Sequence, residues 1–93
     1  MLLSRGEWKR AAAERAAAAA RVKEWTRGAF RLTGSDAVAA NEVACPDPGC
    51  PDRETVILLM RAGEPTRALK ISKPIASVVE SDVLGLLAAE NER

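Results

Sequence analysis

The chain has 93 residues, of which 47% are hydrophobic and 29% are charged, and its formal net charge is +1. A chain of this length supports one hydrophobic core, so a single domain is predicted. Its apolar runs fall well short of the roughly 20 residues that cross a bilayer, which argues against a spanning helix. The sequence contains no histidine. This absence removes the commonest general base and every Ser–His or Cys–His pair, so we predict that the protein is not an enzyme.

Charge is unevenly distributed along the chain. Residues 1–33 carry eight basic and three acidic residues, a net charge of +5, whereas residues 34–93 carry six basic and ten acidic residues, a net charge of −4. This asymmetry divides the single domain into a basic, alanine-rich helix with its connector (1–33) and a small α+β core (34–93). The basic segment lacks a secretory apolar stretch, and its glutamates do not fit a transit peptide. A cytoplasmic location in a bacterium is therefore expected.

The N-terminal segment predicts a long amphipathic helix. Ser4 and Glu7 have the spacing of a capping box at a helix start, and the helix is expected to end near Gly28. Such a helix would be about 36 Å long, more than a core of this size can cover, so its first turns are predicted to project toward a partner. Its apolar stripe, which only Arg15 interrupts, consists of Trp8, Ala11, Ala12, Ala18, Ala19, Val22, Trp25 and Ala29.

Two tryptophans and several arginines of this helix are candidate partner-binding residues. Large aromatic side chains anchor both cores and interfaces, and guanidinium groups suit an acidic protein surface. Nucleic acid is a weaker candidate, because glutamates dilute the charge and few aromatic rings are available to stack on bases. A solvated helix face is the purely structural alternative. The predicted partner-binding residues are Trp8, Arg10, Arg15, Arg21, Trp25 and Arg27.

The remaining segments predict a three-stranded antiparallel meander followed by a short C-terminal helix. The expected strands are 42–45, 55–60 and 67–72, and the middle one is apolar enough to be buried on both faces. Gly63 and Pro65 mark the turn between the second and third strands. The C-terminal helix is expected to start at Ser81, with Ser77 and Glu80 as a competing capping box. The predicted fold class is α+β.

The connection between the first two strands contains both cysteines, in the segment Cys45-Pro46-Asp47-Pro48-Gly49-Cys50. Pro48-Gly49 suits the centre of a type II turn, which would bring the thiols together. Three interpretations remain open: reduced cysteines that close a tight turn, a disulfide across the turn, and a zinc or iron–sulfur site. Metal binding would use Cys45 and Cys50, with Asp47 and Asp52 as further candidates, and would need ligands from a partner or a second chain.

The segments CPDPGCPDRETVI and KISKP resemble a group of small bacterial proteins that share a cysteine turn, an ETVI-like strand and a strand ending in lysine and proline. The resemblance covers roughly residues 42–83 and leaves the alanine-rich helix outside. It implies an autonomous αβ unit and no particular ligand or activity.

These patterns predict a non-enzymatic interaction module, an accessory subunit or adaptor of a larger bacterial complex, that docks through the basic helix and a sheet edge. Its expected partner is another protein, acidic in character, or a second copy of this chain. The alternative is a metal or iron–sulfur handling protein that uses Cys45 and Cys50. A third hypothesis is weak nucleic-acid binding through the basic helix. The absence of any cofactor is the favoured expectation, with zinc or iron–sulfur as the alternative.

Overall fold

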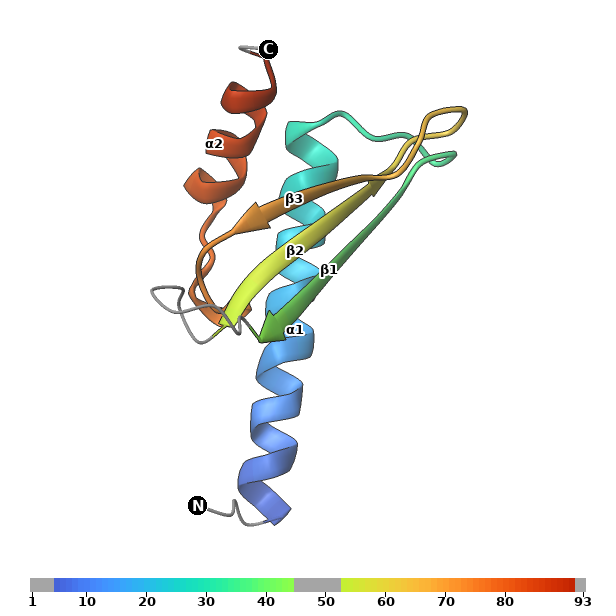
Figure 1. The fold of residues 1–93 in the computed structure, drawn as a ribbon. Coiled ribbons are helices and arrows are strands. Elements are labelled where there is room, and N and C mark those ends of the chain that lie inside the picture. Colours follow the sequence, from blue (N-terminus) through green and yellow to red (C-terminus); the bar gives the residue numbers. More distant parts are fainter. Residues whose placement is uncertain (1–4, 45–52, 92–93) are drawn as a thin grey trace.

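The computed structural model describes residues 5–44 and 53–91. In chain order, the elements are α1 (Arg5–Ala29), β1 (Ala37–Ala44), β2 (Arg53–Met60), β3 (Arg67–Ile71), the 3-10 turn η1 (Ile75–Ser77) and α2 (Glu80–Asn91). The strands form one antiparallel sheet in the order β1-β2-β3, with a long helix before it and a short helix after it, so the predicted α+β meander is confirmed. Figure 1 shows α1 crossing behind the sheet and continuing past the strand ends.

The hydrophobic core lies between one face of the sheet and the two helices. Because side chains alternate across a strand, one set of residues on each strand points at the helices. Leu59 of β2 is paired with Val38 of β1, and Ile57 of β2 with Leu69 of β3, so these inward side chains form adjoining rows. The buried hydrophobic cluster comprises Ala18, Val22, Phe30, Val38, Ile57, Leu59, Leu69, Ile71, Ile75, Val78 and Val83.

The expectation that β2 is buried on both faces is wrong. Its burial alternates: Ile57 and Leu59 are buried, whereas Val56 and Leu58 are only half-buried. The reason is that α1 and α2 both contribute to one core cluster on a single face of the sheet. No helix of the described chain covers the other face, so the outward side chains of β2 stay half-buried.

Strand β1 begins earlier than predicted. Residues 42–45 were the expected strand, but β1 runs from Ala37 to Ala44, and Cys45 lies outside the described residues. Alanine has low strand propensity, so the sequence of this segment gives a weak local signal. Pairing with the strongly β-forming β2 extends the strand, with Ala37 opposite Met60 and Ala44 opposite Arg53.

Helix α1 ends at Ala29, which confirms the predicted end near Gly28. Its terminal geometry is a Schellman motif: the Leu32 N–H donates to the Arg27 carbonyl at 2.9 Å, and the Arg31 N–H donates to the Gly28 carbonyl at 3.3 Å. The left-handed position that usually carries glycine is held by Arg31, with φ 53°. Gly28 therefore lies within the last helical turn and is not the capping glycine.

Asp36 joins the loop after α1 to the turn between β2 and β3. Its Oδ2 atom accepts the Thr33 N–H at 2.8 Å, and its Oδ1 atom accepts the Ala62 N–H at 2.9 Å. These two backbone donors, Thr33 first, lower the pKa of the Asp36 carboxyl below its ordinary value. Within the turn, Gly63 has φ 79°, a backbone conformation that would be strained for any residue with a side chain.

The segment before α2 is fixed by a second carboxylate. The helix begins at Glu80, one residue before the predicted Ser81, and Ser77 belongs to η1. Asp82 accepts the Val79 N–H at 3.0 Å and pairs with Lys73 at 2.9 Å. The Val79 N–H is the main cause that lowers the pKa of the Asp82 carboxyl, and Lys73 adds to it.

Candidate functional site

The first turns of α1 project beyond the rest of the domain, as predicted (Figure 1). None of residues 6–14 is buried, and only Ala11 among them is half-buried. These nine residues, called the projecting segment below, correspond to about 14 Å of helix at 1.5 Å per residue. Although α1 has 25 residues, no helix of the described chain is long and apolar enough to cross a membrane. The projecting segment is thus an exposed helix surface that the core does not use.

Trp8 is the main apolar feature of the projecting segment, and its side chain is 60% exposed. The guanidinium carbon of Arg15 lies 5.9 Å from the centre of the indole ring, within the range of a cation–π contact. A shallow surface hollow lined by Trp8, Lys9, Ala12 and Arg15 runs beside the ring. The contact orients the indole on the helix surface and leaves most of it open to solvent.

The six predicted partner-binding residues do not form one surface. Trp8 and Arg15 lie on the same face of the helix, two turns apart, and are in contact. Arg10 and Arg21 are exposed elsewhere along the helix. Trp25 is half-buried and packs against the core cluster. Arg27 is also half-buried. Of the two tryptophans, the sequence pattern could not say which faces the core: the sheet covers the helix only from its middle turns onward.

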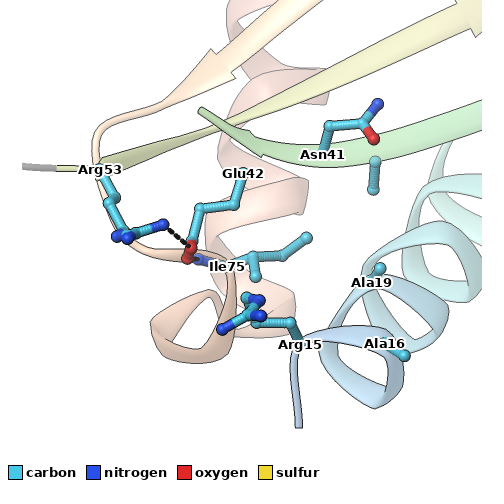
Figure 2. Close-up of a pocket in the computed structure, with 8 residues that line it drawn as sticks. Arg15, Ala16, Ala19, Asn41, Glu42, Arg53 and Ile75 are labelled. Atoms are coloured by element: carbon cyan, nitrogen blue, oxygen red, sulfur yellow. Dashed lines mark hydrogen bonds and ion pairs between the residues drawn. The ribbon is translucent and has the colours of Figure 1, made fainter. Parts of the chain in front are cut away.

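Arg15 stands at the junction between the projecting segment and the body of the domain. Besides its contact with Trp8, it lines a pocket of about 260 Å³ where α1, β1, β2 and η1 meet (Figure 2). In Figure 2 the side chains of Arg15, Glu42 and Arg53 gather at one end of this pocket, and Ala16 and Ala19 lie at the other. The complete lining is Arg15, Ala16, Ala19, Ala40, Asn41, Glu42, Arg53 and Ile75.

Glu42 is the central polar group of this junction, and the sequence patterns did not predict a role for it. Its Oε1 atom accepts a hydrogen bond from Arg53 Nη1 at 3.0 Å, and its Oε2 atom accepts the Ile75 N–H at 2.9 Å. The Glu42 side chain is only 10% exposed, whereas that of Arg53 is 59% exposed. Both carboxylate oxygens are therefore engaged in tying β1 to β2 and η1. The sequence did contain a signal: Glu42 is four residues after Val38, so both side chains point to the core face of β1. A charged side chain on that face needs a hydrogen-bond or ion-pair partner.

The cysteine site lies outside the described residues. Cys45, Asp47, Cys50 and Asp52 all belong to the segment 45–52, so the three interpretations of the cysteine turn stay predictions. Within residues 5–44 and 53–91 there is no group of three or more acidic, cysteine or histidine side chains that could hold a metal ion.

Comparisons with protein-family models, curated protein sequences and solved structures found no significant match to this chain. The function proposed below therefore rests on the geometry of the molecule itself.

Proposed function

We propose that this chain is a non-enzymatic interaction module, an accessory subunit or adaptor of a larger bacterial protein complex, and that it docks through the projecting segment of α1. The observation that carries the proposal is a helical extension that buries no side chain in its own core while presenting a tryptophan that is 60% exposed. Exposed aromatic side chains of this size are typical of interaction surfaces, where they supply most of the binding free energy.

The chemistry of the projecting segment indicates what kind of partner it fits. Alanines line the helix around Trp8, so another helix or a flat surface can approach its backbone closely. Lys9 and Arg15 place positive charge around the indole ring. Opposite charges across an interface accelerate encounter and select the right partner. The matching surface is a protein with an apolar pocket for an indole ring and carboxylates at the rim of that pocket.

Arg15 gives the docking surface a fixed connection to the body of the domain. Its guanidinium lies over the indole of Trp8, and its side chain also lines the pocket beside Glu42. An aromatic anchor that is already oriented loses less conformational entropy on binding than a freely rotating one. Arg15 is thus a positioning residue for Trp8 in this proposal.

The test compares variants of the full chain purified from bacteria together with the proteins that bind it. Trp8→Ala combined with Arg15→Ala is expected to lose the copurifying proteins. Leu84→Ala is the matched control, because Leu84 is another exposed large apolar residue, 49% exposed, but lies on α2. The control should retain the same proteins, and circular dichroism should show that both variants are folded.

A chain that lacks residues 1–14 provides the decisive case. This truncation removes the projecting segment and leaves the buried Ala18 and Val22 in place. If the truncated chain still copurified with the same proteins in the same yield, docking through α1 would be wrong.

A further inference from the structure

The two edges of the sheet differ in how they resist pairing with another strand. Edge strand β3 has only five residues, and two of them, Arg67 and Lys70, are charged and exposed. Pro65 precedes β3 and Pro74 follows it. Short length, edge lysines and flanking prolines are the features by which natural sheets prevent edge-to-edge association. The β3 edge is thus protected.

Edge strand β1 has none of these features. It has eight residues, contains no proline or basic residue, and pairs with β2 in an unbroken register from Ala37 to Ala44 that leaves no room for a bulge. Its single charge, Glu42, is nearly buried and bonded to Arg53 and to the Ile75 N–H. Within the described chain β2 is its only strand neighbour. Alternate backbone N–H and C=O groups of β1 therefore face outward, and no strand among the described residues pairs with them.

We infer that β1 pairs with β1 of a second copy of this chain, antiparallel about a two-fold axis, so that the two three-stranded sheets merge into one continuous sheet. In a continuous sheet, residues paired across the two-fold axis point to the same face, so they must be an even number of positions apart in the sequence. Centring the pair on Asn41 places Ala39 opposite Val43, and Ala40 opposite Glu42, so that no like charges face each other. Backbone hydrogen bonds would supply the affinity, as in strand addition.

The composition of β1 favours a second copy over a foreign strand. On the face of the sheet that no helix covers, β1 presents only Ala37, Ala39, Asn41 and Val43, all uncharged and mostly small. A foreign partner would be selected by charged or bulky side chains, which this edge does not offer. A self-complementary edge needs neither, because symmetry aligns the same pattern with itself. Val43, which is 37% exposed, would be partly covered by Ala39 of the second copy.

This inference adds a self-association surface to the interaction module proposed above and does not depend on it. The projecting segment extends past the end of the strands (Figure 1), whereas the rest of α1, residues 15–29, packs against β1 and is called the core half below. Trp8→Ala should therefore leave self-association unchanged. Substitutions in β1 should leave the projecting segment folded and exposed.

Sedimentation equilibrium of the full chain, from micromolar to millimolar concentration, tests the inference. The wild-type chain should form a reversible dimer. Ala39→Lys with Asn41→Lys brings like charges together across the two-fold axis and should weaken the dimer more than about tenfold. Ala68→Lys on β3 is the matched control, an exposed alanine on the same sheet face at the opposite edge, and should dimerise like the wild type.

Charge reversal distinguishes self-pairing from other modes of association. The glutamate version, Ala39→Glu with Asn41→Glu, should also be monomeric alone, and an equimolar mixture with the lysine version should restore a dimer. A wild-type chain that stays monomeric at millimolar concentration, or a lysine version that dimerises as well as the wild type, would overturn the inference. Hydrogen exchange on the wild-type chain needs no variant: amides of residues 37–44 should exchange more slowly at high concentration, and equal rates at both concentrations would also overturn it.

Discussion

The two halves of α1 have similar composition but opposite environments. Both are rich in alanine and basic residues, yet Ala18 and Val22 are buried in the core half, whereas Ala12 is exposed in the projecting segment. The difference comes from what lies against the helix: β1, η1 and α2 contact it and cover only its middle and final turns. An alanine stripe therefore does not by itself define a core, because its role depends on whether another element reaches it.

The largest difference in free energy of unfolding is expected between alanine substitutions of the aromatic residues at the two ends of α1. Phe30 follows the core half and is 5% exposed, whereas Trp8 is 60% exposed. Phe30→Ala should lower the free energy of unfolding by about 3–5 kcal/mol, through lost burial and the cavity left behind. Trp8→Ala should lower it by less than about 1 kcal/mol, the range of an exposed cation–π contact. Urea denaturation of both variants measures the difference.

A Trp8→Ala cost comparable to that of Phe30→Ala would contradict this contrast. It would mean that the indole is packed in solution, by the domain or by another molecule. Repeating the measurement at several protein concentrations separates these two cases, since only packing between molecules depends on concentration.

A smaller contrast is expected from the same substitution at two alanines. Ala18→Leu inserts three carbon atoms where the side chain is 1% exposed, and overpacking of this kind costs about 1–3 kcal/mol. Ala12→Leu enlarges an exposed position and should change the free energy of unfolding by no more than about 0.5 kcal/mol. Leucine and alanine have similar helix propensities, so the substitution tests packing and not helix formation. Equal effects at the two sites would show that the projecting segment is covered.

The elements that the sequence predicted correctly are those with strong local signals. The length of α1, its end near Gly28 and the β2–β3 hairpin follow from periodicity and turn residues, which act within a few positions of the chain. Even the projection of α1 could be anticipated, because a helix of that length exceeds what a core from a chain of 93 residues can cover.

The features that the sequence did not reveal depend on distant contacts. Glu42 is held by Arg53 and by the Ile75 N–H, 33 residues away, and this arrangement exists only after the sheet and η1 have assembled. Burial of the Thr26 side chain, whose hydroxyl donates to the Val22 carbonyl at 2.7 Å, likewise depends on elements distant in sequence that pack against α1. The left-handed conformation of Arg31 is imposed by the Schellman motif against the preference of its side chain.

The stability of the protein should depend on pH through Asp36, in the loop that follows the core half of α1. Its pKa is lowered in the folded state, because the Thr33 and Ala62 N–H groups stabilise the carboxylate. A lowered folded pKa means that the contribution to stability is complete above the ordinary pKa of about 4 and is lost as the pH falls through the folded value.

Asp36→Asn removes the charge and should destabilise the protein at pH 7, with a smaller difference from the wild type at pH 3. Trp8→Ala should instead keep the wild-type dependence on pH. Urea denaturation at both pH values measures these differences, and an Asp36→Asn effect that is equal at pH 7 and pH 3 would show that the carboxylate charge does not tie the α1–β1 loop to the β2–β3 turn.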